Sequence, residues 1–181
     1  MGAARPPLAG ADELRIGQAC ALDGPAKGLG QGMHLGLRAA IAQANAAGGV
    51  HGRTLALVAH DDGYDPERCI DATARLVEQD KVFCLAGFVG TPTSKAALPI
   101  ATEAGVPVVG LFTGAMFLRQ PPQPLVFNVR ASYDDETEVL VERLTAEFGI
   151  YAVSTGRICL AALNSRNIDY VADAIAAVLK S

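Results

Sequence analysis

Strand and helix patterns alternate along most of this chain, with short connections between them. Short apolar runs predict strands over residues 14–22, 54–60, 82–86, 107–111 and 125–129. Helical spacing of apolar residues and helix-start signals predict helices over residues 30–47, 65–79, 91–104, 115–119 and 134–148. Parallel strands need crossover connections, so this alternation is typical of a parallel sheet with helices on both faces. We therefore predict an α/β fold, a three-layer sandwich with a mostly parallel sheet.

The pattern changes after about residue 146. Apolar segments at 150–153 and 157–163 flank Ser154, Thr155 and Gly156, which predicts a β-hairpin. A final amphipathic helix is predicted over 168–179, and its apolar side carries Val171, Ile175 and Val178. We expect residues 146–181 to pack on the same domain as residues 14–145 and to complete the sheet edge. Residues 1–13 are predicted to form a flexible leader.

Composition and charge narrow the classes of function. Of the 181 residues, 50 % are hydrophobic and 19 % are charged, which is typical of a globular core. The net charge of −4 argues against a nucleic-acid partner, because proteins that bind nucleic acids are normally basic. The longest apolar run, residues 105–112, is too short to span a bilayer. The first seven residues lack the apolar core of a signal peptide, so the chain as given is predicted to be cytoplasmic unless a signal has been removed.

The four cysteines have no spacing typical of metal binding or redox chemistry. Cys84 and Cys159 lie within predicted apolar strands, where a buried free thiol is the favoured interpretation and a disulfide or a reactive thiol is the alternative. We predict no catalytic residue, no metal site and no cofactor, because no Ser/His/Asp, Cys/His or paired-carboxylate pattern rises above chance. The four cysteines of the chain are Cys20, Cys69, Cys84 and Cys159.

A group of polar residues after the second predicted strand suggests a metal cluster at first sight: His60, Asp61, Asp62 and Asp65. Gly63 and Pro66 are interleaved with them, and aspartate strongly prefers turns and helix N-caps. A turn followed by a capped helix is therefore the favoured interpretation, and metal binding is the alternative.

The turn at residues 87–94 is the strongest candidate for a ligand site. It follows an apolar strand directly, and Thr91 and Pro92 occupy positions expected for an N-cap and a first helical residue. A helix N-terminus offers unpaired backbone N–H groups and a positive dipole end, which together can hold a carboxylate. Simple capping of the helix is the alternative interpretation. In parallel sheets, ligands sit outside the carboxyl ends of the strands, where this turn is predicted to lie.

Six sequence motifs follow one another in order along residues 14–145. They are Asp23-Gly24-Pro25, residues 45–53, residues 61–66, residues 87–94, residues 103–107 and Phe127-Asn128-Val129-Arg130. Through these motifs, residues 14–145 resemble the N-terminal lobe of periplasmic binding proteins of the leucine/isoleucine/valine type, the solute-binding proteins of ABC transporters. The resemblance implies a non-catalytic, periplasmic protein that binds an amino acid or related carboxylate and works with an ABC permease.

The same resemblance implies which residues bind the ligand. The amino-acid head group would be held by Thr91 and by the loop Phe112-Thr113-Gly114, with Leu29 covering it. Family members often carry a disulfide at the positions matching Tyr64 and Gly90, and this chain has no cysteine at either. The family traps ligand between two lobes, and residues 14–145 are expected to supply only one of them. Binding is therefore expected to be weak, and the exposed cleft face is a candidate surface for a homodimer.

Residues 146–181 resemble the C-terminal end of aspartate and aromatic aminotransferases, through residues 147–158 and 163–167. In those enzymes the arginine matching Arg157 grips the substrate carboxylate. No lysine in a matching context and no phosphate loop for pyridoxal phosphate are present, so transamination is not supported. Three interpretations remain open. They are a solute-binding lobe, an engineered or fused chimeric scaffold with no ligand, and, with least support, an aminotransferase-related fragment.

Overall fold

The computed structural model describes residues 12–151 and 163–179, which form two compact units. The first unit comprises residues up to 113 together with 118–130, and the second comprises 114–117 and the chain from 131 onward. The predicted hairpin at 150–163 falls almost entirely outside the described residues, and the two described residues at its start, Ile150 and Tyr151, are not in a strand. None of the described helices is long and apolar enough to cross a membrane.

A five-stranded sheet forms the centre of the first unit. Its strands are β1 (Glu13–Cys20), β2 (Thr54–Asp61), β3 (Cys84–Ala86), β4 (Val108–Val109) and β5 (Val126–Phe127). They lie in the order β2-β1-β3-β4-β5, and each of the four pairings is parallel. The α/β class and the parallel sheet are therefore confirmed. No strand after β5 joins the sheet within the described part of the chain, so the completed sheet edge expected from the tail is not seen there.

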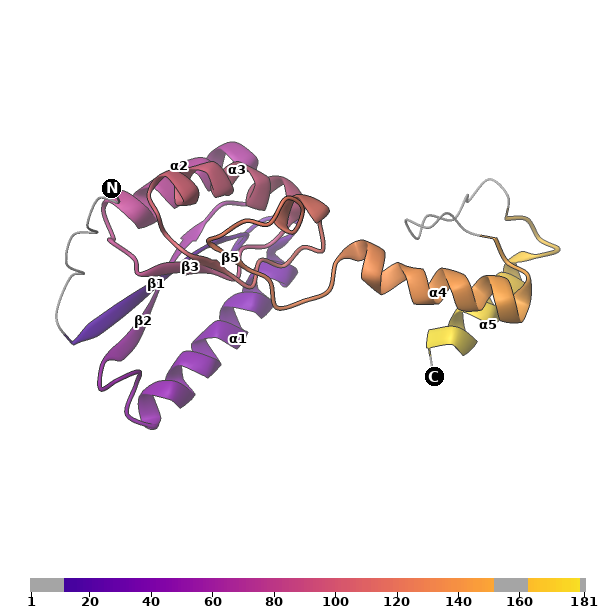
Figure 1. The fold of residues 1–181 in the computed structure, drawn as a ribbon, viewed down its shortest axis with the longest axis horizontal. Helices are drawn as coiled ribbons and strands as arrows, with labels where there is room; N and C mark the ends of the chain where they lie inside the picture. Colours follow the sequence, from indigo (N-terminus) through magenta and orange to yellow (C-terminus); the bar gives the residue numbers. More distant parts are fainter. Residues whose placement is uncertain (1–11, 152–162, 180–181) are drawn as a thin grey trace. The chain divides into compact units, whose positions relative to one another are not determined.

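Helices cover the two faces of this sheet. They are α1 (Lys27–Ala46), α2 (Pro66–Glu78) and α3 (Thr91–Glu103). α2 and α3 lie together on one face and α1 lies on the other (Figure 1). Gly17 in β1 lets the α2 face close tightly, because a side chain there would meet Leu76, Val82 and Leu85 at 3.0–3.2 Å. All three of those side chains are buried, so the core lies between the sheet and α2 and α3.

Local signals explain where most of these elements begin and end. Asp65 is the N-cap of α2 and accepts a hydrogen bond from the Arg68 N–H at 2.9 Å, while Pro66 supplies the first helical residue. β4 ends two residues earlier than predicted because Gly110 adopts a left-handed φ of 60°, which interrupts the extended backbone. β3 begins two residues later than predicted, at Cys84.

The described residues of the second unit form the α-helices α4 (Tyr133–Phe148) and α5 (Ile168–Leu179). Ser132 and Asp135 form a reciprocal capping box at the start of α4, with both hydrogen bonds at 3.0 Å. The apolar side predicted for the final helix is used within this unit, since Ala174 and Val178 are buried against Leu144 of α4. Packing of the tail on the 14–145 lobe stays a prediction.

Candidate functional site

The 87–94 turn connects β3 to α3 at the carboxyl edge of the sheet. The N-cap of α3 is Gly90, with φ 103° and ψ 150°, and not Thr91 as predicted. Glycine reaches this backbone conformation without the steric cost that threonine would pay, which moves the helix start by one residue. Thr91 is therefore the first helical residue and Pro92 the second.

The side chain of Thr91 points to the neighbouring loop. Its hydroxyl lies 2.7 Å from the hydroxyl of Thr113, so the two threonines predicted to bind ligand form a hydrogen-bonded pair. Phe112 is tied to the same turn, because it makes a parallel bridge with Val89 and its N–H donates to the Phe88 carbonyl at 2.8 Å. The loop after β4 and the turn after β3 are thus held together by both backbone and side-chain contacts.

The N-terminus of α3 carries no negative charge of its own. No side chain caps the helix, and no acidic residue lies in its first turn. The hydroxyl of Thr93 donates back to the Val89 carbonyl at 2.6 Å, so it does not cap the first turn either. The positive end of the helix dipole is therefore left uncompensated by the described side chains at this edge of the sheet.

A buried hydrogen-bond chain fixes the other end of the turn. The amide of Gln18, fully buried in β1, donates from Nε2 to the Gly87 carbonyl at 3.1 Å. Its Oε1 lies 2.8 Å from Nδ1 of His34 on α1. With the amide in this orientation, Oε1 is the acceptor and the Nδ1 of His34 carries the proton. The sequence did not predict these hydrogen bonds, because Gln18, His34 and Gly87 lie far apart in the chain, in β1, in α1 and in the turn after β3.

The other two predicted ligand residues, Leu29 and Gly114, make no hydrogen bond to the threonine pair among the contacts that the structure describes. Leu29 is in the first turn of α1, after β1, and its side chain is 55 % exposed. Gly114 belongs to the second unit, where its carbonyl accepts the Tyr133 N–H at 2.9 Å. A side chain at Gly114 would lie 2.7 Å from the Tyr133 nitrogen, so the close backbone approach requires glycine. Ligand binding by Thr91, Phe112, Thr113, Gly114 and Leu29 remains a prediction.

Arg130 lies over the ring of Phe112. Its guanidinium carbon is 5.5 Å from the centre of the ring, a distance typical of a cation–π contact. Phe112 is 41 % exposed, so the pair brings a positive charge to the surface near the loop after β4. Arg130 is the last residue of the motif Phe127-Asn128-Val129-Arg130, but the sequence did not indicate its contact with Phe112.

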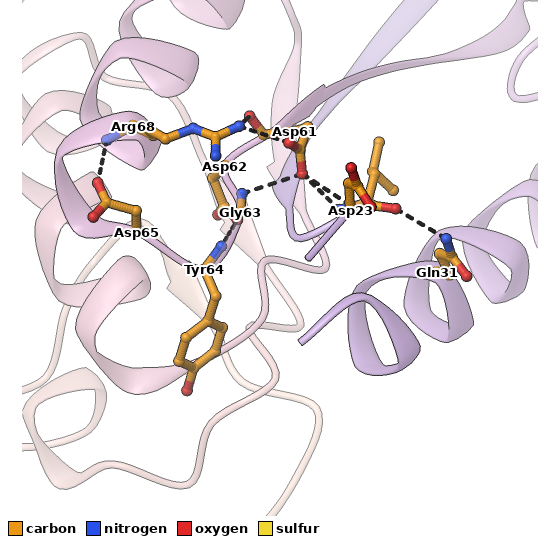
Figure 2. Close-up of polar contacts among 9 residues, drawn as sticks. Asp23, Gln31, Asp61, Asp62, Gly63, Tyr64, Asp65 and Arg68 are labelled. Atoms are coloured by element: carbon orange, nitrogen blue, oxygen red, sulfur yellow. Dashed lines mark hydrogen bonds and ion pairs between the residues drawn. The ribbon is translucent and has the colours of Figure 1, made fainter. Parts of the chain in front are cut away.

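Asp61 ties the loop after β1 to the loop after β2 (Figure 2). Its Oδ1 accepts N–H groups of Leu22 at 2.7 Å, Gly63 at 3.1 Å and Asp23 at 3.2 Å, and its Oδ2 lies 2.6 Å from the Arg68 guanidinium. Burial acts to raise the pKa of this carboxyl, but the three N–H donors and Arg68 outweigh it and lower the pKa below its ordinary value. Asp61 therefore acts as a charged structural staple.

The turn-and-cap interpretation of this segment is confirmed. Asp62 Oδ1 accepts the Tyr64 N–H at 2.8 Å, Asp65 caps α2, and His60 pairs with Asp80 at 2.8 Å. Within the described residues, no group of three or more His, Cys, Asp or Glu side chains is arranged to hold a metal ion. The second oxygen of Asp62 is buried without a hydrogen-bond partner there, and burial raises the pKa of this carboxyl.

Two of the described cysteines, Cys20 and Cys69, are free thiols. Cys20 and Cys69 are buried, and burial raises the pKa of each to about 12. Their thiols are protonated at neutral pH and therefore unreactive. Cys84 is half-buried, and Cys159 lies outside the described residues.

Comparison with known proteins identifies the family. Residues 13–181 match the periplasmic binding protein family, and the chain belongs to it. A possible leucine/isoleucine/valine-binding protein from Rhodopirellula baltica has a similar structure, with a TM-score of 0.72 and 42 % identity over 76 % of this chain and 37 % of that one. The resemblance to the leucine/isoleucine/valine-binding branch is thus confirmed, for part of one lobe. This family comprises non-catalytic solute-binding proteins.

Two curated relatives show that only parts of longer proteins are matched. A leucine-, isoleucine-, valine-, threonine- and alanine-binding protein of Pseudomonas aeruginosa is 35 % identical over 53 % of this chain and 26 % of its own length. An aspartate aminotransferase of the same species is 60 % identical over 48 residues, which are 26 % of this chain and 12 % of the enzyme. The short aminotransferase resemblance is therefore confirmed as a similarity. The chain spans about a quarter or less of the length of these relatives.

Proposed function

We propose that this chain is the ligand-binding lobe of an ABC-type uptake system for branched-chain or related amino acids, and that it has no catalytic activity. The ligand is an amino acid or a related carboxylate, held at the N-terminus of α3. An ABC permease is the proposed downstream partner, and the periplasm the proposed location of the mature protein. The curated relatives named for leucine, isoleucine and valine binding support this choice of ligand.

The single observation that carries the proposal is the threonine pair beside α3. The hydroxyls of Thr91 and Thr113, 2.7 Å apart, lie at a helix N-terminus that has no capping side chain and no acidic residue in its first turn. Hydroxyl donors and a positive dipole end together favour a carboxylate. In this proposal the pair opens to accept the ligand, and each hydroxyl then donates to a carboxylate oxygen.

The remaining predicted residues are given supporting roles. Phe112 is partly exposed next to the threonine pair and offers an apolar surface to the ligand's hydrocarbon part. Leu29, exposed at the start of α1, covers the ligand from the loop after β1, and the backbone of Gly114 contributes to the head-group loop. Contacts from one lobe bury only part of a ligand, so the affinity of the isolated chain is expected to be low.

The test is titration of the chain with leucine, isoleucine, valine and related acids, followed by calorimetry and by backbone NMR shifts. We expect saturable shifts centred on residues 90–94, and at least about a tenfold loss of affinity in Thr91→Val. Thr102→Val is the matched control, because Thr102 is exposed near the other end of the same helix. An affinity equally reduced in both variants, or shifts centred elsewhere, would reject the proposed site.

Two other interpretations are separated by the same experiment. A chimeric scaffold without ligand would show no saturable shift with any amino acid. An aminotransferase-related fragment is favoured only by the 48-residue match, and it would show a pyridoxal phosphate absorbance band on addition of that cofactor. Sedimentation at several protein concentrations tests the proposed homodimer through the cleft face.

A further inference from the structure

Tyr64 lies directly against Gly90, the N-cap of α3. A Cβ built on Gly90 would be 2.4 Å from Cε2 of the tyrosine ring and 2.8 Å from its hydroxyl oxygen. The ring therefore fills the space that a side chain at residue 90 would occupy. Because the two residues are 26 positions apart, this packing links the loop after β2 to the 87–94 turn after β3.

The backbone that presents this ring is in an uncommon conformation. Tyr64 has φ 66° and follows Gly63 at φ 57°, so two consecutive residues are left-handed. Such a conformation is costly for a bulky side chain and persists only where the surroundings hold it. Here Asp62 accepts the Tyr64 N–H at 2.8 Å and Asp61 accepts the Gly63 N–H at 3.1 Å. The tyrosine ring points away from the Asp61–Arg68 pair (Figure 2).

We infer that Tyr64 is a positioning residue for the 87–94 turn: its ring fixes Gly90 and the first turn of α3 in the geometry that receives the ligand. The effect on ligand affinity rests on the proposed function, whereas the effect on the turn itself does not. The hydrogen bonds of Asp61, including that to Arg68, fix the loop after β2. This loop positions the Tyr64 ring, and the ring packs against Gly90, the N-cap of α3. On the other side of the turn, Thr113 holds Thr91 through its hydroxyl.

Packing and not hydrogen bonding carries this role, and two of the three nearest atoms, Cε2 and Cζ, belong to the ring and are kept in phenylalanine. No hydrogen bond of the phenol is found within the described residues, and the side chain is 38 % exposed, so one part of the ring packs and another faces solvent. Tyr64→Phe should therefore preserve the function, and Tyr64→Ala should remove it. Tyr151→Ala makes the same change at a tyrosine that is 86 % exposed in the second unit, and serves as the matched control.

The first measurement is amide hydrogen exchange by NMR without ligand. The Ser94 N–H donates to the Gly90 carbonyl at 3.1 Å and so reports on the N-cap. We expect its exchange to accelerate by about tenfold in Tyr64→Ala and to change less than about twofold in Tyr64→Phe and Tyr151→Ala. The Leu85 N–H, which donates to the Pro107 carbonyl within the sheet, is the internal reference and should not change.

Three outcomes would overturn the inference. They are unchanged Ser94 exchange in Tyr64→Ala, failure of Tyr64→Phe to restore it, and equal acceleration at Leu85, which would make Tyr64 a general stability residue. The second measurement is leucine titration of the same variants, where about a tenfold weaker affinity is expected for Tyr64→Ala alone. If the unmodified chain binds no amino acid, the proposed function fails while the exchange data still decide the role of Tyr64.

Discussion

Two helices begin at the carboxyl edge of the same sheet, and their first turns are built differently. α2 starts at Asp65, whose own carboxylate accepts the Arg68 N–H, and Glu67 adds a further negative charge in its first turn. α3 starts at Gly90, with no capping side chain and no acid in its first turn. At the start of α2 a side chain of the protein accepts a backbone N–H of the first turn. At the start of α3 no described side chain does so.

The difference separates a structural junction from a candidate binding junction. A helix N-terminus that holds its own carboxylate is stabilised but has little further capacity for an anion. One without such a group keeps its amides and dipole for an external carboxylate. The absence of a good cap at α3, usually counted as a defect, is what supports a ligand site there.

The largest expected effect comes from removing the glycine that starts α3. In Gly90→Ala, the added methyl would meet the Tyr64 ring at 2.4 Å with φ at 103°, so we expect a loss of about 3 kcal/mol in the free energy of unfolding. Gly105→Ala is the control, because Gly105 also has a left-handed φ, of 64°, but nothing within 4 Å of its added carbon. Urea denaturation measures both. Equal losses would show that contact with Tyr64 adds nothing.

The second prediction concerns a variant in which α3, like α2, has a carboxylate at its N-terminus. Thr91→Asp places a carboxylate in the first turn of α3, where it should compete with the ligand and weaken amino-acid binding by about a hundredfold. Thr91→Asn, which has nearly the same shape but no charge, should bind more tightly than the aspartate variant. Calorimetric titration compares the two, and indistinguishable affinities would contradict a role for the open dipole end.

The third prediction removes the cap of α2. Asp65→Ala should lower the free energy of unfolding by about 1 kcal/mol, because the Arg68 N–H loses its acceptor at the helix start. Asp71→Ala changes an exposed aspartate within the same helix and should have almost no effect. Thermal unfolding monitored by circular dichroism tests the pair, and ligand affinity should be the same in both variants.

The fourth prediction concerns acid sensitivity of the loop before α2. The folded pKa of Asp61 is lower than its ordinary value, so the charged form stabilises the fold above that ordinary value and the stabilisation disappears as pH falls through the lowered pKa. The stability difference between the unmodified chain and Asp61→Asn should therefore be largest near pH 7 and shrink towards pH 2. Urea denaturation at a series of pH values measures it. A constant difference would argue that the carboxylate charge is unimportant.

The smallest effect is expected inside the helices. The hydroxyl of Ser94 in α3 is buried and has no partner within the described residues, whereas that of Thr73 in α2 donates to the Cys69 carbonyl at 2.7 Å. Ser94→Ala should be neutral or stabilising by up to about 1 kcal/mol, and Thr73→Val should be destabilising by a similar amount. A marked loss of stability in Ser94→Ala would reveal a contact for that hydroxyl.

Local sequence signals were enough to locate most elements of the first unit. The Asp65-Pro66 pair marked the start of α2, and Thr91-Pro92 marked the start of α3 to within one residue. Strand ends were less accurate where a glycine such as Gly110 turns the backbone. These features depend on a few neighbouring residues, which is why a sequence pattern predicts them well.

The contacts of the candidate site could not be predicted in the same way. Gln18 sits in the middle of an apolar strand, and only the fold brings it to His34 and the Gly87 carbonyl. Two of the donors to Asp61, the N–H groups of Leu22 and Asp23, come from 39 and 38 positions away, through the pairing of β1 with β2. The family resemblance pointed to Thr91 and Thr113, but not to the hydrogen bond between them or to the ring of Tyr64 on Gly90.

The burial of Cys20 and Cys69 also bears on how the chain is made. Once folded, both thiols are protonated and enclosed, so an oxidising compartment and a reducing one should leave these two positions chemically alike. The unfolded chain has no such protection, because its thiols are exposed and have ordinary acidity. Whether Cys20 and Cys69 stay reduced therefore depends on the rate of folding relative to the rate of thiol oxidation. Once the two side chains are buried, their redox state no longer changes.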